Sequence, residues 1–178
     1  MSCIQTKKST RLVMMQEVID NFFTKEQNEK IIELLSRPQW SFTGGGIQDG
    51  ISSLFWHMDN LERDEYFLDL YKEIITRLKI QNASLVRCYA NGQTAGQSGV
   101  PHQDDGDLTV LYFPLPWEHY LGGHLNFVDG DDIKSVIEYK QYRLVLFPAS
   151  ITHYAGSPDR QYLGLRVSLA FKIKLEKS

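Results

Sequence analysis

Three residues of this chain have the types and the order of a metal-binding set: His102, Asp104 and His153. Two histidines and one carboxylate on one face of an iron ion leave positions open for an oxidisable cosubstrate and for dioxygen. His102 and Asp104 stand at positions i and i+2, so at the end of a strand both side chains point to the same side. The third ligand must then come from a distant strand, and His153 is placed to supply it.

A second His-x-Asp pair, His57-Met58-Asp59, competes with the first. Such a short pattern arises easily by chance, so its position in the chain must decide. His57 precedes a predicted helix and lies outside the strand-rich half of the sequence, whereas His102 lies between two predicted strands. We therefore expect His57 at the periphery, as a core residue or as part of a pocket rim.

A dicarboxylate cosubstrate that binds the metal at one end also needs a cation for the carboxylate at its far end. Arg166 stands in the strand-like run Arg-Val-Ser-Leu-Ala-Phe, and Ser168 shares its face by alternation. A guanidinium can bind a carboxylate through two hydrogen bonds. Arg160 is the alternative, but it lies in the polar turn Gly-Ser-Pro-Asp-Arg-Gln, so Arg166 is preferred.

The segments that must position these residues divide into a helical part and a strand-rich part. Apolar residues from Val13 to Phe23 predict a short strand entering a turn, and a capping box of Thr24 and Gln27 predicts a helix that Pro38 ends. The Gly- and Ser-rich stretch that follows predicts a loop or an irregular hairpin, and a second helix is predicted next. These segments are residues 41–56 and 61–79, respectively.

Short β-rich runs separated by turn signals follow one another in the second half of the chain. They cover residues 84–90, 108–115, 124–128, 134–139, 142–147 and 165–171. Two helices followed by six strands favour an α+β fold with helices packed on an antiparallel sandwich or barrel.

Composition limits the function classes. The chain has 178 residues, 42% of them hydrophobic, and a net charge of -3, which lacks the basic footprint of a nucleic-acid-binding protein. No signal peptide or membrane span is evident, so we expect a cytoplasmic protein with no membrane partner. Cys3 and Cys88 are expected to be reduced, with Cys88 acting as a small buried residue.

The ordered motifs resemble the 2-oxoglutarate- and iron(II)-dependent oxygenases of the prolyl 4-hydroxylase type. The motifs are Tyr89-x-x-Gly92, His102-x-Asp104, Leu-Thr-Val-Leu-Tyr-Phe, Gly122-Gly123-His-Leu-x-Phe127, Tyr-Arg-Leu-Val-Leu-Phe-Pro, His153 and Arg166-x-Ser168-Leu169. Residues 17–32 also look like the entry strand and helix of that family, so the resemblance covers nearly the whole chain. Each motif alone is weak, and their order carries the resemblance.

The resemblance implies a fold, a domain plan and a ligand set. The fold would be a double-stranded β-helix (jelly-roll) with N-terminal supporting helices, in one domain over residues 1–178, with helical support over about 12–80 and a β-core over about 83–173. The residues that it assigns are His102, Asp104 and His153 for Fe(II), Arg166 for the C5 carboxylate of 2-oxoglutarate, Tyr89 for the cosubstrate pocket, and Ser168 as a lesser candidate for the same carboxylate. Dioxygen would be the other cosubstrate, with ascorbate as an additional candidate.

The implied activity is hydroxylation of a C–H bond, foremost in a prolyl residue of a peptide or protein. Two alternatives remain. One is oxidative demethylation of nucleic acid, because the run after Arg166 loosely resembles that of such enzymes in having a second cation, Lys172. The other is a non-catalytic jelly-roll binding module. Three departures from the family pattern stand out. The segment between Gly92 and His102 is long, His124 replaces the usual glutamate after Gly-Gly, and Arg166 lies farther than usual from His153.

For the remaining polar residues with the chemistry of a site, we predict roles outside catalysis and metal binding. Asp105 and Asp107 are expected to be solvated, because neither has a partner at the right strand position. His119 and His124 lack a third ligand to complete a zinc site. Residues 129–138 only superficially resemble a calcium loop, so a hairpin turn is predicted there.

Overall fold

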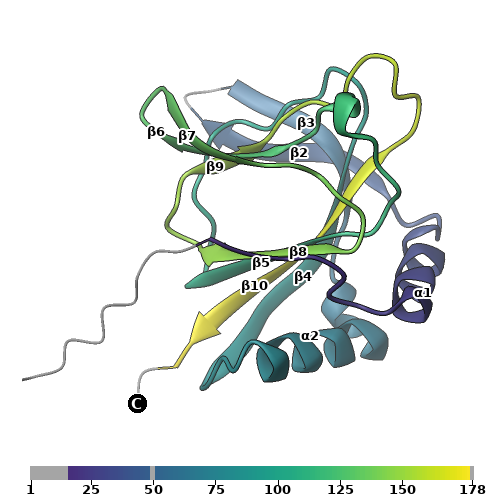
Figure 1. Ribbon diagram of the computed structural model, residues 1–178, viewed down its shortest axis with the longest axis vertical. Coiled ribbons are helices and arrows are strands. Elements are labelled where there is room, and N and C mark those ends of the chain that lie inside the picture. Colours follow the sequence, from purple (N-terminus) through teal and green to yellow (C-terminus); the bar gives the residue numbers. More distant parts are fainter. Residues whose placement is uncertain (1–15, 49–50, 177–178) are drawn as a thin grey trace, which may run out of the picture.

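The computed structural model describes residues 16–48 and 51–176, and it consists mostly of β-strands with two α-helices (Figure 1). The expected strand over Val13–Phe23 lies partly outside the described residues, and Cys3 lies wholly outside them. Within the described part, no helix is long and apolar enough to cross a membrane. The strands are β1 (Glu17–Ile19), β2 (Ser41–Gln48), β3 (Ile51–Met58), β4 (Ala83–Gln93), β5 (Leu108–Phe113), β6 (Leu125–Asp129), β7 (Asp132–Ile137), β8 (Arg143–Pro148), β9 (His153–Ala155) and β10 (Arg166–Leu175).

Two antiparallel sheets face each other across the interior (Figure 1). The larger sheet has seven strands in the order β1-β8-β5-β10-β4-β3-β2, and the smaller one has the order β7-β6-β9. The six runs predicted in the second half of the sequence correspond to β4, β5, β6, β7, β8 and β10. The hairpin predicted in place of a calcium loop is present as β6 and β7.

The helices α1 (Lys25–Leu35) and α2 (Glu65–Arg77) pack on the outer face of the large sheet. The predicted capping box of Thr24 and Gln27 begins α1, which satisfies backbone N–H groups that the first helical turn leaves free. Ile31 and Ile74, one from each helix, are fully buried in the same apolar cluster as the outward-facing residues of β10. This cluster holds the two helices against the outer face of the large sheet.

Strand β10 shows how alternation separates the core from the site. Val167, Leu169 and Phe171 point to the helices and belong to the outer apolar cluster. Arg166 and Lys172 stand on the opposite face, which looks toward the small sheet. Because β10 lies between β5 and β4, its inward residues stand at the centre of the large sheet.

The Gly- and Ser-rich stretch forms an irregular hairpin, which was one of its two predicted alternatives. Strands β2 and β3 pair with a register shift between Gly44 and Ile47. Strand β3 then joins the large sheet through β4, with His57 opposite Asn91. His57 is half-buried and lies in the strand next to the edge strand β2, because the hairpin extends the sheet at this end.

Candidate metal centre

The two chain segments that carry the possible ligands are tied to each other by their backbones. His102 and His153 exchange both amide hydrogen bonds, at 3.0 and 2.9 Å, and form an isolated antiparallel bridge. The amide of Asp104 donates to the carbonyl of Ala149 at 2.9 Å. Residues that lie far apart in the sequence are thereby held in a fixed mutual position.

The side chains of His102, Asp104 and His153 converge, with their possible ligand atoms within 4.8 Å of one another. The Nε2 atom of His102 lies 3.4 Å from Oδ1 of Asp104, and Nε2 of His153 lies 3.3 Å from Oδ2. Among the described residues, this is the only group of three or more such side chains that could hold a metal ion.

The orientation of both imidazoles is set by backbone carbonyl groups. Nδ1 of His102 lies 2.9 Å from the carbonyl oxygen of Val100, and Nδ1 of His153 lies 2.9 Å from that of Ile151. A carbonyl can only accept, so each Nδ1 carries the proton and donates it. Each Nε2 is therefore the ring nitrogen that faces Asp104 and the centre, which is the position from which a histidine held in this way binds a metal ion.

Asp104 is almost completely buried and keeps its charge through its partners. Its side chain is 3% exposed. Burial by itself would raise the pKa of this carboxyl, but the hydrogen bonds with His102 and His153 and the charge of Lys172 outweigh it and hold the pKa well below its usual range. In return, Asp104 raises the pKa of His102.

Lys172 and Thr109 engage one oxygen of Asp104. The ammonium of Lys172 donates to Oδ2 and is itself buried, and the hydroxyl of Thr109 donates to the same oxygen at 2.7 Å. Oδ1 lies toward His102. The carboxylate is therefore fixed on one side and still presents an oxygen to the centre.

Arg166 is a buried cation without a carboxylate partner. It is 1% exposed, and within the described part of the chain it takes part in no ion pair. Its Nε donates to the carbonyl of Gly123 at 2.7 Å, and one terminal nitrogen donates to Oε1 of Gln93 at 3.0 Å. Burial lowers the pKa of Arg166 to about 10. Such a group is costly to bury unless a ligand brings a compensating negative charge.

The second glycine of the Gly-Gly motif, Gly123, lies against the side chain of Arg166. Gly123 has a φ of +67°, and a Cβ atom there would lie 2.9 Å from Cδ of Arg166. Only glycine accommodates both this backbone conformation and this close approach. The motif therefore makes room for the arginine and provides the carbonyl that orients it.

One pocket connects Arg166 with the two histidines. Its walls come from alternate residues of β4 and β10 together with residues of the small sheet, so both sheets contribute to it. The lining residues are Phe55, Tyr89, Asn91, Gln93, Gly99, His102, Leu111, Leu125, His153, Ala155, Arg166, Ser168 and Lys172. Five of the six residues predicted for the site line this pocket, and Asp104, the sixth, lies against two of them, His102 and His153.

Several other polar residues of the sequence lie away from this pocket or have partners of their own. Arg160 is exposed on the surface and does not line the pocket. Asp105 is exposed, as expected, but it has a partner, because it forms an ion pair of 2.7 Å with Arg87. Asp107 was expected likewise, but its Oδ2 accepts from the amide of Leu175 at 2.8 Å.

The competing histidines have local contacts. His119 is exposed, and Nδ1 of His124 accepts a hydrogen bond of 3.4 Å from the amide of Tyr139. His57 stacks on Phe55, with ring centroids 4.8 Å apart, and burial lowers its pKa. None of the three belongs to the possible metal-binding group.

Sequence reasoning missed three polar residues of the site: Lys172 as a partner of Asp104, and Asn91 and Gln93 in the pocket wall. Alternation could have found them, because Lys172 stands six positions after Arg166 and both β4 residues follow Tyr89 at even spacing. Oδ1 of Asn91 is buried and has no hydrogen-bond partner in the structure. An orphaned acceptor at a pocket wall is a group that a ligand can satisfy.

Comparison with solved structures identifies the fold. A 2OG-Fe(II) oxygenase family member from Burkholderia pseudomallei aligns with a TM-score of 0.74 and 13% identity, over 92% of this chain and 86% of that one. The chain has the fold of these oxygenases. No protein-family model matches it, and neither does any curated protein.

Two further similar structures hold ligands. HygX from Streptomyces hygroscopicus, with nickel, 2-oxoglutarate and hygromycin B bound, aligns with a TM-score of 0.70 and 12% identity, over 91% of this chain and 83% of that one. A prolyl hydroxylase from Trichoplax adhaerens, in complex with a hypoxia inducible factor peptide fragment, aligns with a TM-score of 0.66 and 17% identity, over 88% and 81%.

Proposed function

We propose that this protein is a 2-oxoglutarate- and iron(II)-dependent oxygenase, formed by one domain with a double-stranded β-helix as its core and the helices as its support. His102, Asp104 and His153 would hold Fe(II). Arg166 would bind the C5 carboxylate of 2-oxoglutarate, with Ser168 and Tyr89 at the walls of the same pocket. The observation that carries the proposal is the buried guanidinium of Arg166, which has no ion-pair partner among the described residues and lines the same pocket as the two histidines.

The donor set fits this metal. Two imidazole nitrogens and one carboxylate oxygen form the ligand set of non-haem Fe(II) oxygenases. When bound, iron and 2-oxoglutarate would supply the oxidising chemistry that converts a C–H bond to C–OH. The chain would orient the two imidazoles through Val100 and Ile151, hold the charge of Asp104 through Lys172, and shield the pocket from water by burial.

Anaerobic titration tests this assignment without requiring a substrate. Fe(II) and 2-oxoglutarate together should produce a visible metal-to-ligand charge-transfer band when they bind in one site. His102→Ala and Asp104→Ala should abolish the band, and the exposed histidine variant His119→Ala should retain it. A folded parent protein that gives no band would rule out the proposed function.

For the substrate, we propose a prolyl residue in a peptide or protein. A structure of similar fold binds a peptide in its own complex, and the acidic balance of this chain disfavours a nucleic-acid substrate. Lys172, which supported the demethylase alternative, is buried against Asp104 rather than directed at a backbone phosphate.

Mass spectrometry tests the substrate class. Proline-containing peptides incubated with the enzyme should gain one oxygen atom only when 2-oxoglutarate is present, and the Asp104→Ala protein serves as the control. Demethylation of a methylated oligonucleotide with no change in the peptides would replace the peptide proposal. Succinate formation alone would already exclude the non-catalytic module.

A further inference from the structure

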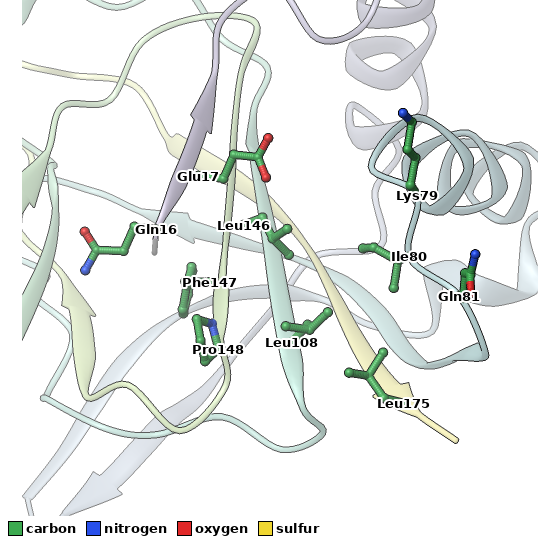
Figure 2. Close-up of a pocket in the computed structure, with 10 residues that line it drawn as sticks. All are labelled: Gln16, Glu17, Lys79, Ile80, Gln81, Leu108, Leu146, Phe147, Pro148 and Leu175. Atoms are coloured by element: carbon green, nitrogen blue, oxygen red, sulfur yellow. The ribbon is translucent and has the colours of Figure 1, made fainter. Parts of the chain in front are cut away.

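Two pockets of the structure differ in where their charges lie. The pocket in Figure 2 is lined mainly by apolar side chains, among them Leu108 and Leu146, and its charged residues Glu17 and Lys79 are exposed. In the pocket of the metal centre, by contrast, Arg166 is buried. Water screens exposed charges, so the buried guanidinium responds more strongly to a single neighbouring group. The residue that holds this guanidinium is therefore a candidate determinant of cosubstrate binding.

Gln93 stands beside Arg166 in the sheet and is the neutral partner of its side chain. The two residues are directly opposite each other in the pairing of β4 with β10, and both are 1% exposed. Nη1 of Arg166 donates to Oε1 of Gln93 at 3.0 Å, while Nε donates to the carbonyl of Gly123 at 2.7 Å. Acceptors on two different nitrogens fix the plane of the guanidinium. No described residue accepts a hydrogen bond from Nη2, so this nitrogen is left for a ligand.

The amide of Gln93 can present only one of its two ends to Arg166. A guanidinium only donates hydrogen bonds, so Oε1 must face it and Nε2 must face away. Nε2 donates to the backbone carbonyl of Gln97 at 2.9 Å. The orientation of the Gln93 amide, and through it that of Arg166, therefore depends on the position of Gln97.

A closed turn, residues 94–97, holds Gln97 in this position. The amide of Gln97 donates to the carbonyl of Thr94 at 3.1 Å, and the amide of Thr94 donates to Oε1 of the Gln97 side chain at 2.7 Å. The amide of Gly96 donates to Oγ of Ser157 at 2.7 Å, which ties the turn to the segment after β9. The turn is part of the long segment before His102 that departs from the family pattern. This segment thus carries the contacts that hold the buried arginine.

We propose that Gln93 is a positioning residue for cosubstrate binding and that the turn of residues 94–97 holds it in place. Its neutral amide orients the guanidinium of Arg166 without supplying a negative charge, so the cation stays available for a carboxylate of 2-oxoglutarate. A glutamate at this position would pair with Arg166 and compete with that carboxylate. The inference rests on the proposed function, because it deepens the role of Arg166 in it.

Calorimetric titration with 2-oxoglutarate, without oxygen and with Mn(II) in the metal site, tests the need for a neutral residue. Gln93→Glu should raise the dissociation constant for 2-oxoglutarate by about tenfold or more. The dissociation constant for Mn(II) should stay unchanged, because the hydrogen bonds of Gln93 lead to Arg166 and Gln97 and not to the metal-binding residues.

Gln141→Glu is the matched control for this replacement. Its side-chain amide likewise donates to a backbone carbonyl, that of Pro114 at 3.1 Å, but Gln141 does not line the pocket. The same chemical change there should leave both dissociation constants at the parent values.

Two replacements of Gln97 test the turn. Gln97→Ala removes the side-chain acceptor of the Thr94 amide and should weaken the binding of 2-oxoglutarate severalfold. Gln97→Glu keeps a carbonyl-type acceptor at the same place in the side chain. It should therefore restore the parent affinity, which a variant that merely lost packing would not do.

The outcomes separate positioning from a purely structural role. Parent-like affinity for 2-oxoglutarate in Gln93→Glu would overturn the proposal. So would an equal loss of Mn(II) and 2-oxoglutarate binding, which would mean that the replacement distorts the whole site. Parent-like affinity in Gln97→Ala, or an equal loss in Gln97→Ala and Gln97→Glu, would overturn the part assigned to the turn.

A double-mutant cycle on the ligand-free protein keeps this inference distinguishable from the proposed function. Gln93→Leu and Arg166→Met, alone and combined, should change the free energy of unfolding non-additively, because the two side chains share a buried hydrogen bond. Additive changes would overturn the positioning. If the parent chain binds Mn(II) but not 2-oxoglutarate, the proposed function fails, and the cycle still decides whether Gln93 holds Arg166.

Discussion

At the residue scale, the site depends on how each charge is compensated. Asp104 has two histidines, Lys172 and Thr109 around it. Arg166 has only neutral acceptors, Gly123 and Gln93. If Asp104 binds a metal as proposed, its carboxylate is held in position by these contacts, whereas Arg166 has no anionic partner among the described residues and could take one from a bound dicarboxylate.

Replacing Lys172 tests the first half of this arrangement. Lys172→Met removes the cation from a buried ion pair, so we expect the free energy of unfolding of the metal-free protein to fall by about 3 kcal/mol. Added Mn(II) should restore part of this loss, because the metal replaces the missing positive charge beside Asp104. Denaturant unfolding with and without Mn(II) measures both effects. Lys174→Met, an exposed lysine of the same strand, should show neither.

Replacing Arg166 tests the second half. Arg166→Ala should raise the KM for 2-oxoglutarate by roughly tenfold or more, since loss of a buried charged contact costs about 2 kcal/mol or more. The exposed Arg160→Ala protein should keep the parent KM. Steady-state succinate formation gives both values, and a larger effect at Arg160 would transfer the role to that residue.

His57 carries an unsatisfied polar atom that the fold tolerates. Its Nε2 is buried without a hydrogen-bond partner. His57→Phe keeps the aromatic contact with Phe55 and removes the polar atom, so we expect the free energy of unfolding to rise by about 1 kcal/mol. Denaturant unfolding measures the change. A decrease would mean that His57 has a partner, such as an ordered water, that the replacement disrupts.

At the element scale, β1 is attached to β8 by charge as well as by its backbone. Asp20 follows β1, and its carboxylate accepts hydrogen bonds from Arg143 at 2.7 Å and from Lys140 at 2.6 Å. The bond from Arg143, and then that from Lys140, lower the pKa of Asp20 to about 2. This edge strand therefore has a pH-dependent attachment.

The pH dependence of this attachment has a defined sign. A carboxyl whose pKa is lower in the folded state stabilises the protein above its unfolded pKa of 3.8 and loses that contribution as the pH falls toward about 2. Asp20→Asn should lower the free energy of unfolding at pH 7 by up to about 1 kcal/mol, because the pair is partly exposed. The difference should vanish near pH 2. Asp132→Asn, from a more exposed pair, controls for general charge effects.

At the scale of the whole molecule, the two facing sheets bring segments that are distant in the sequence together in one site. Both ligand-bearing segments join the core through the bridge between His102 and His153. A ligand that binds only the folded protein stabilises it by mass action. We therefore expect Mn(II), at 100 times its dissociation constant, to add about 2.7 kcal/mol to the free energy of unfolding. Thermal unfolding measures this, and His153→Ala should show no such gain.

The sequence by itself determined the elements and the order of the site residues. The capping box of α1, the strands of the second half and the spacing of His102, Asp104 and His153 are local properties, because they depend on backbone geometry and on the alternation of side chains along a strand. The preference for Arg166 over Arg160 came from the strand-like run around Arg166 and the polar turn around Arg160, and of the two only Arg166 lines the pocket.

Only the tertiary structure decided which residues from different strands meet. The ion pair of Lys172 with Asp104 and the inclusion of β3 in the large sheet depend on strand order and register. Those are set by packing between residues that lie far apart in the sequence, which no local pattern encodes. For the same reason the segment around His57 does not itself show that a hairpin adds this residue to the sheet beside Asn91.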